Sequence, residues 1–537
     1  PPFVRAATPD AATASGWDVR VRHGDGVPDP VAVNRAVLAD LENGATSVWL
    51  TLGGPSLAVG DLDRALDGVY LELAPVVLDA GADAVAAADA LLALAGRRHV
   101  APGGLRGSFG ADPVGTRVRT GTAPGDELFP ELVERCRQAP ALRVATADAT
   151  VWHEAGASDA QELGLGTAVG VAYLRALTGA GLGIDEALAA LDFRWAVGVE
   201  QFPSIAKLRA ARRIWDRVAD VCGAADGRRG QDQHAVTSTA MLTERDPWVN
   251  LLRATIGCFA AAVGGAGAIT VTPFDAALGV SDDFARRIAR NTQSILHDES
   301  SLARVIDAAG GSWFVESLTD ELAAAGWEVF TGIERAGGIA AALDAGTVDG
   351  LLRPVRERRA ADIAHRRRPI TGVSEYAFVD EPPVQRPPRP APPAGLLPQE
   401  RYAAPYEQLR GAADAAPERP TVFLAGLGSL AASNVRSSFA STLFHAGGLA
   451  CVTAAGDRET LVTSFRASGA TVACLCGTDK AYAADGAELA RALRDAGATQ
   501  LWLAGRAEVD GVDGRLYAGC DALAVLRAVH DHLGVAR

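Results

Sequence analysis

The stretch DPVAVNRAVLADLENGATSVWLTL, residues 29–52, contains a complete helix pattern followed by a strand pattern. Asp29 can cap the helix, and the proline after it suits the first helical position, which needs no N–H donor. Gly44 is typical of the residue that ends a helix. The apolar run at 47–52 is typical of a strand that is buried on both faces. The stretch therefore predicts a helix over 31–43 and a strand directly after it.

The same alternation continues to about residue 375. Helical patterns cover 61–68 and 83–95, and an apolar strand pattern covers 69–79, interrupted at Pro75. Alternating helices and buried strands favour an α/β fold with a parallel sheet. The length exceeds that of a bare (β/α)8 TIM barrel but suits one that carries extra helices. Long outer helices are expected at 204–222, 246–263 and 281–297. We predict a TIM barrel over residues 1–375.

A proline-rich segment follows the predicted barrel. Residues 381–393 read EPPVQRPPRPAPP, which favours an extended, polyproline-like spacer, so we assign 376–420 as a linker. From residue 421 the strand and helix patterns resume. Strands are expected at 421–425, 450–453, 471–476 and 500–504, with helices to about 445 and at 457–468, 485–496 and 522–533. This spacing predicts a flavodoxin-like domain over 421–537.

Composition excludes several classes of protein. The 537 residues are 48% hydrophobic and 22% charged, which is ordinary for a globular protein, and the net charge of −14 disfavours nucleic acid as a partner. The basic run 356–368 is interpreted as a solvated or domain-facing helix surface. No apolar run is long enough to predict a membrane span. The chain begins at Pro1 without a signal-like segment, which fits a partial chain lacking an N-terminal arm.

Seven scattered cysteines without a CxxC pair indicate free thiols in a reducing compartment, and hence a cytoplasmic protein without a metal site. Residues 426–431, GLGSLA, match a loose glycine-rich phosphate-binding pattern after a strand. The acidic residue expected about twenty positions later is missing, since Asp457 comes too late. Dinucleotide binding is therefore disfavoured.

Four segments of the predicted barrel read RWAVGVEQFPSIAKLRAARRIW (194–215), DPWVNLLR (246–253), SDDFARRIARNTQSILHDES (281–300) and GGSWFVESLT (310–319). In this order they resemble the methylmalonyl-CoA mutase family, and specifically its small subunit from bacterial heterodimeric enzymes. The resemblance implies a radical isomerase that interconverts (R)-methylmalonyl-CoA and succinyl-CoA. It also implies that the C-terminal domain is of the cobalamin-binding type, and that the protein would position a cofactor that performs the difficult chemistry.

The positions that the resemblance assigns to the cobalt ligand are altered in this chain. Catalytic members carry Asp-x-His-x-x-Gly in the first loop of the cobalamin domain, and the matching residues here are Leu430, Ala432 and Val435. Aliphatic side chains can neither ligate cobalt nor orient a histidine ligand. His445 lies too far along the expected helix to substitute. We therefore expect no cobalamin and no metal on this chain, and a degenerate flavodoxin-like domain.

The barrel positions implied by the resemblance are altered as well. Thr150 and Val151 stand where catalytic members carry Tyr-His, before the run Trp-His-Glu-Ala-Gly that replaces their Met-Gln-Glu-Ala-Gly. His234 matches a substrate-contacting histidine, but Val236 replaces the glutamine two residues later. A single retained histidine in a site that has lost its other polar residues is interpreted as structural.

These patterns favour a small, non-catalytic subunit. The expected partner is a catalytic large subunit that holds adenosylcobalamin and acyl-CoA, with a G-protein chaperone of the mutase as a further candidate partner. Two alternatives stay open. One is a self-sufficient acyl-CoA isomerase with unusual cobalamin binding, and the other is a regulatory or metabolite-binding protein with a mutase fold that has lost its activity. Because the fold alone does not determine function, the side chains at the site are needed to distinguish these hypotheses.

Overall fold

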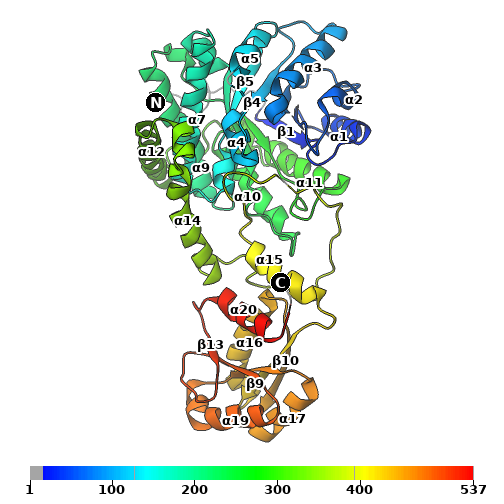
Figure 1. Cartoon of the computed structure of the whole chain (residues 1–537), viewed down its shortest axis with the longest axis vertical. Helices are drawn as coiled ribbons and strands as arrows, with labels where there is room; N and C mark the ends of the chain where they lie inside the picture. The colour runs from blue at the N-terminus through cyan, green and yellow to red at the C-terminus, as the bar shows by residue number, and fades with distance from the viewer. Residues whose placement is uncertain (1–15, 126, 392, 536–537) are drawn as a thin grey trace. The chain divides into compact units, whose positions relative to one another are not determined.

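Eight parallel strands close into a barrel in which the strands follow one another in chain order and β1 pairs with β8 (Figure 1). The computed structural model describes residues 16–125, 127–391 and 393–535. The barrel strands are β1 (Asp18–His23), β2 (Ser47–Thr51), β3 (Val76–Asp79), β4 (Gly107–Ala111), β5 (Leu142–Asp148), β6 (Leu191–Val197), β7 (Gln233–Thr237) and β8 (Ala268–Thr270). The predicted TIM barrel is confirmed.

Helices cover the outside of the barrel. They are α1 (Pro30–Glu42), α2 (Leu62–Ala65), α3 (Ala84–Arg97), α4 (Pro113–Thr120), α5 (Leu128–Cys136), α6 (Thr150–Glu154), α7 (Asp159–Gly179), α8 (Ile184–Ala189), α9 (Gln201–Val221), α10 (Val249–Val263), α11 (Asp283–Ser294), α12 (Trp313–Arg335) and α13 (Ile339–Asp344). Helix α14 (Thr347–Ala364) follows them and belongs to the barrel unit only up to residue 356. The long helix α12 packs against α7 and α9 (Figure 1), so these additional residues form a further helical layer.

Where the sequence has strong capping residues, the helix begins and ends close to the predicted positions. The Asp29 side chain accepts a hydrogen bond from the Val31 N–H at the start of α1. Gly44 follows the end of that helix with a φ of 106°, a conformation that favours glycine. Most expected helices differ from the observed ones by one to three residues at an end, and two boundaries show a physical reason for the difference. Strand β3 begins only at Val76, after the proline, and the last turn of the helix expected to reach residue 297 is a π-helix, Ile295–Glu299.

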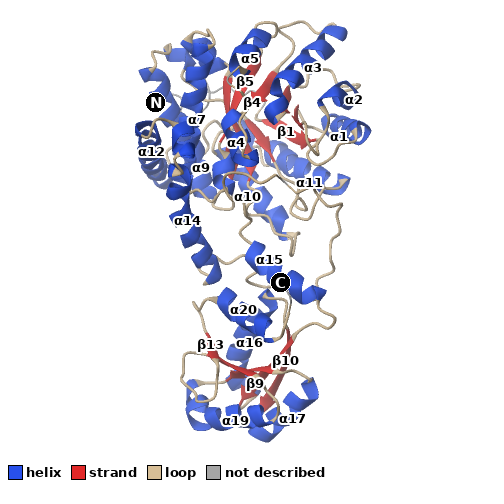
Figure 2. Cartoon of the chain, in the orientation of Figure 1, coloured by secondary structure: helices blue, strands red, loops and turns tan. Residues whose placement is uncertain are grey.

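A parallel sheet forms the second fold element (Figure 2). It has five strands in the order β10-β9-β11-β12-β13. Its strands are β9 (Thr421–Leu427), β10 (Ala450–Gly456), β11 (Val472–Cys476), β12 (Gln500–Ala504) and β13 (Gly514–Leu516). Helices α16 (Leu430–Ala446) and α20 (Ala522–His532) cover one face, and α17 (Arg458–Ser468) and α19 (Ala487–Asp495) cover the other. This is the flavodoxin-like order, which confirms the predicted class. The short strand β13 was not predicted.

The chain divides into two compact units. Of the described residues, the first holds 16–125, 127–242, 250–356, 385–391 and 393–400, and the second holds 243–249, 357–384 and 401–535. The stretch expected as a linker contains helix α15 (Ala404–Ala415), whose Tyr406 and Leu409 are buried in the core of the second unit. Within the described residues, no helix is both long enough and apolar enough to cross a membrane.

Candidate functional site

Three neighbouring strands bring polar side chains to one level inside the barrel. Asp148 ends β5 and is the register partner of Arg194 on β6, which is in turn the partner of His234 on β7. On β6 the flanking side chains point the other way, since Phe193 contacts Trp215 of the outer helix α9. The alternation of a strand therefore places all three polar side chains in the barrel interior.

A buried ion-pair cluster links these residues to α4. The Asp148 carboxylate accepts from Arg194 at 2.8 Å and from Arg119 at 3.2 Å, and Arg119 also reaches Asp112 at 3.1 Å. The Tyr173 hydroxyl donates to Asp112 at 2.6 Å, while accepting from the Val114 N–H. Each charge in the cluster thus faces an opposite charge or a hydrogen bond inside the barrel.

The two carboxyl groups of this cluster respond differently to burial. Burial would raise the pKa of Asp148, but the guanidinium groups of Arg194 and Arg119 outweigh it and lower this pKa. Burial dominates at Asp112 and raises the pKa of that carboxyl, and repulsion from Asp148 adds to the rise although Arg119 opposes it. Asp148 is therefore the firmly ionised member of the pair.

His234 uses both ring nitrogens within the barrel. Its Nε2 lies 2.7 Å from Oγ1 of Thr270, and that hydroxyl donates to the Arg20 carbonyl. The hydroxyl proton is thereby used, so Nε2 must carry the hydrogen, and Nδ1 accepts from Nε of Arg194 at 3.3 Å. Burial, together with nearby arginines, lowers the pKa of His234 well below its ordinary value. The ring is neutral and has no nitrogen left for a substrate.

Trp49 fills the space beside this histidine. Two guanidinium groups lie over its ring, with Arg194 at 4.0 Å and Arg22 at 4.6 Å from the ring centroid. The same ring meets His234 edge-on at 5.3 Å. Cation–π contacts of this kind are worth roughly 0.5–2 kcal/mol each and hold the stack in place. Bulky side chains therefore occupy the interior at the level of His234, although the buried indole N–H of Trp49 has no hydrogen-bond partner there.

The other predicted barrel positions differ in their surroundings. Thr150 joins the cluster, since its N–H and its hydroxyl both donate to Oδ1 of Asp148, at 3.0 and 2.5 Å. Val151 is buried in the hydrophobic core of the barrel unit, and Val236 adds no polar atom to the site. The structure thus connects Thr150 with His234 through Asp148 and Arg194, and leaves the two valines outside the polar cluster.

A second buried cluster was missed in the sequence. Nε2 of His153 lies 2.8 Å from the Ser238 hydroxyl, and its Nδ1 lies 3.3 Å from Glu162. Lys207 binds the same Glu162 oxygen at 2.6 Å, and the other oxygen accepts from the Ala196 N–H. Ser238 is almost completely buried, so we interpret the cluster as a tie between α6, α7, α9 and β7. The sequence signal that could have indicated this cluster was His153, which replaces a glutamine of the family motif.

In the second unit, the predicted cobalt-ligand positions lie on the first turns of α16. The Ser429 side chain caps this helix by accepting from the Ala432 N–H. Leu430 and Val435 are 65% and 76% exposed. His445 lies at the other end of α16, where it contacts Ser441, and partial burial lowers its pKa. At the three motif positions, the exposed start of the helix therefore carries no side chain other than aliphatic ones.

The family model described as methylmalonyl-CoA mutase matches residues 56–394 of this chain. The chain belongs to the methylmalonyl-CoA mutase family. The methylmalonyl-CoA mutase small subunit of Streptomyces virginiae is 53% identical to it, over all of this chain and 88% of the relative. The small subunit of Propionibacterium freudenreichii subsp. shermanii is 38% identical, over all of this chain and 86% of the relative.

Other mutases of the family align only in part. The methylmalonyl-CoA mutase of Escherichia coli is 38% identical over 42% of this chain and 32% of its own length. Similarity over the whole chain is thus found with proteins named small subunits.

The mutase family implies cobalamin, and the residues present do not fit it. A cobalt-ligating histidine would need a position at the start of α16, where Leu430 and Ala432 stand. The four histidines of the second unit are used elsewhere: His445 contacts Ser441, His530 binds the Gly447 carbonyl, His532 binds Thr499 and His365 binds the Ala361 carbonyl. Among the residues that the structure describes, no group of three or more His, Cys, Asp or Glu could hold a metal ion.

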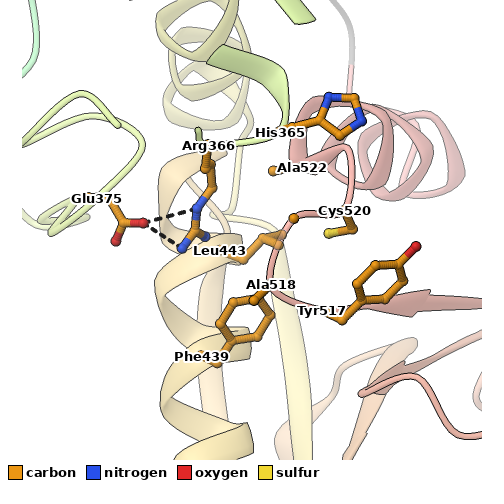
Figure 3. A pocket seen from close by; sticks show the side chains of 10 residues that line it. His365, Arg366, Glu375, Phe439, Leu443, Tyr517, Ala518, Cys520 and Ala522 are labelled. Atoms are coloured by element: carbon orange, nitrogen blue, oxygen red, sulfur yellow. Dashed lines mark hydrogen bonds and ion pairs between the residues drawn. The ribbon is translucent and has the colours of Figure 1, made fainter. Parts of the chain in front are cut away.

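A small pocket of about 150 Å³ lies in the second unit, between α16 and the segment before α20 (Figure 3). Arg366 and Glu375 form an ion pair at its wall at 2.7 Å, and Phe439 lies under the Arg366 guanidinium. Its lining residues are His365, Arg366, Glu375, Phe439, Leu443, Tyr517, Ala518, Gly519, Cys520 and Ala522. Pockets for cofactors and drug-sized ligands enclose roughly 300–1,000 Å³. This pocket is too small for a corrin or an acyl-CoA.

Proposed function

We propose that this chain is a non-catalytic small subunit of an adenosylcobalamin-dependent methylmalonyl-CoA mutase. Its partner would be a homologous large subunit that binds the cofactor and the acyl-CoA, and interconverts (R)-methylmalonyl-CoA and succinyl-CoA. The observation that carries the proposal is the set Leu430, Ala432 and Val435 at the start of α16. No side chain of this set can ligate a metal or fix the tautomer of a ligating imidazole.

The barrel supports the same proposal. An acyl-CoA needs a passage through the barrel and polar groups that are free to bind the thioester. In this chain Trp49 and Arg194 fill the interior, and both nitrogens of His234 are engaged. Opening a passage would break a buried ion pair and a cation–π stack, at a cost of several kcal/mol.

The names of the full-length relatives support a two-chain enzyme, because a small subunit implies a large one. A G-protein chaperone of the mutase would act on the large subunit, which holds the cofactor. The seven cysteines are free thiols, which fits a reducing compartment such as the cytoplasm. The role left to this chain is to stabilise its partner by burying a shared surface.

The proposal is tested by mixing experiments with the large subunit of the Streptomyces virginiae mutase. We expect no methylmalonyl-CoA isomerisation and no change in the adenosylcobalamin spectrum with this chain alone. Turnover should appear when the two chains are combined with the cofactor. Turnover by this chain alone, or a dissociation constant for cobalamin of about 1 µM or tighter, contradicts the proposal.

Replacing His234 by alanine is expected to change kcat/KM of the assembled enzyme by less than about threefold. The reason is that His234 is neutral and its nitrogens bind Arg194 and Thr270 rather than a ligand. Stability should fall by roughly 1–3 kcal/mol, because buried hydrogen-bonding groups lose their partner. Kinetics and denaturant unfolding on complexes of equal subunit content separate the two effects. A hundredfold drop in kcat with an intact complex would show that this barrel binds substrate.

A further inference from the structure

The outer face of α10 lacks the charged residues that a solvent-facing barrel helix carries. Its sequence, VNLLRATIGCFAAAV, contains one charged residue, Arg253, and that side chain is buried. Leu252 and Ile256 nevertheless lie on the surface. The neighbouring outer helix α11 carries three charged residues outside the core: Asp283, Arg286 and Arg287. A helix that is apolar on all sides is normally covered on all sides.

Aromatic side chains from α9 and α12 extend this apolar surface. A small core cluster joins Ile205 of α9, Ala260 and Val263 of α10, and Val315 of α12, with Leu302 and Ala309 packed against it. Phe202 lies one turn before Ile205 and contacts Phe314 edge-on at 5.4 Å. We define the α10 face by its exposed apolar residues: Phe202, Leu252, Ile256, Val305, Ile306, Trp313 and Phe314.

A buried arginine anchors the loop of this face that carries Val305 and Ile306. Arg209 of α9 is almost completely buried and pairs with Asp307 in the loop before α12 and with Glu316 at 2.7 Å on its first turn. Glu316 also accepts from the Gly311 N–H at 3.0 Å. The loop that presents Val305 and Ile306 is therefore anchored from inside. A presented apolar surface of this kind is typical of an interface rather than of a disordered loop.

The size of the face matches a subunit interface. Large aromatic side chains bury about 150–250 Å² each. Trp313, Phe314 and Phe202 are 91%, 60% and 45% exposed. Together they present on the order of 400 Å² of apolar surface. Monomers rarely expose more than a few hundred Å² in one patch, and a stable dimer needs roughly 800 Å² from each partner. The aromatic residues alone supply about half of that.

We propose that the α10 face is where the large mutase subunit docks. The inference rests on the proposed function, because a small subunit requires a large partner, and it deepens that function by naming the surface. The partner chemistry that fits is an apolar surface of a homologous barrel, with few charges opposite α10. Interfaces of obligate partners are of this apolar type.

The test uses full-length chain and the large subunit of the Streptomyces virginiae mutase. Leu252→Glu and Trp313→Glu each place a charge in the α10 face, and both positions are exposed, so folding should be retained. The matched control is Val221→Glu, because Val221 is 66% exposed, Leu252 is 65% exposed, and Val221 ends the helix whose first turn carries Phe202. Calorimetry and light scattering measure assembly, and hydrogen exchange on the unaltered chain measures protection of residues 249–263 and 302–318.

We expect both face variants to weaken assembly at least tenfold, the control to change it less than about twofold, and exchange in both segments to slow on complex formation. If the unaltered chain assembles and the face variants assemble equally well, the docking surface lies elsewhere and the proposed function stands. If the unaltered chain neither assembles nor supports turnover, the proposed function itself fails. Self-association that Leu252→Glu abolishes would assign the face to a second copy of this chain.

Discussion

Replacing Arg194 by alanine is expected to destabilise the barrel unit by about 3–5 kcal/mol at neutral pH. The variant removes the 2.8 Å ion pair to a buried Asp148, the stack on Trp49 and the hydrogen bond to His234. Arg119 remains at 3.2 Å from Asp148, but it is the more exposed of the two arginines and compensates only in part. Denaturant unfolding followed by tryptophan fluorescence measures the effect.

The control for this variant is Arg213→Ala. Arg213 lies on α9 and pairs with Asp320, and both side chains are largely exposed. Exposed ion pairs contribute about 0–1 kcal/mol, so this variant should unfold close to the unaltered chain. If Arg194→Ala proves no more costly than Arg213→Ala, the interior cluster does not stabilise the barrel.

The pH dependence identifies Asp148 as the group responsible. With Arg194 present its pKa is lowered, so its contribution to stability is complete above its ordinary pKa of 3.8 and is lost as the pH falls below that value. Without Arg194, burial should raise the pKa of Asp148, and protonation then relieves the uncompensated charge. The difference between Arg194→Ala and the unaltered chain should therefore shrink from pH 7 to pH 4.5. A constant difference would place the effect outside this carboxyl.

The alternation of strands and helices made the two folds predictable, but not every boundary. The helix at 30–42 and the strand after it follow from capping residues and an apolar run that are contiguous in the sequence. Strand β13 has three residues and only Leu516 is apolar, so it carries no periodic signal. It exists because β12 offers it hydrogen-bonding partners, and such tertiary pairing is invisible to a local pattern.

The candidate site was predictable at single positions and not as a network. Leu430 and Ala432 were expected in the first loop after β9, by resemblance to the family motif, and the structure places them on the first turn of α16. The ion pairs of Asp148 join strands and helices from distant parts of the chain, which no spacing rule relates. The sequence did contain one signal for polar side chains in the barrel interior. Charged residues occupy alternate positions of β1, namely Asp18, Arg20 and Arg22. Inside a strand, that spacing places them all on one face.

The second large effect is expected at Lys207 of α9. Its ammonium group is almost completely buried and lies 2.6 Å from Glu162 and 2.9 Å from Asp159. Burial would lower the pKa of Lys207, but Asp159 and Glu162 outweigh it and raise this pKa. A lysine whose pKa is raised on folding by ionised carboxylates adds stability that is complete below its ordinary pKa of 10.5 while those carboxylates stay ionised, and that is lost as the pH rises above 10.5. The contribution is therefore complete at neutral pH.

Lys207→Met keeps the apolar stem and removes the charge, which leaves Glu162 buried with only His153 and the Ala196 N–H as partners. We expect a loss of about 3–5 kcal/mol in denaturant unfolding, since an uncompensated buried charge is costly. Adding Glu162→Gln removes that charge, so the double variant should be more stable than the sum of the two single effects by at least about 1 kcal/mol. Additive effects would mean that Lys207 and Glu162 do not stabilise each other, and that the cluster joining α7 and α9 owes its stability to packing alone.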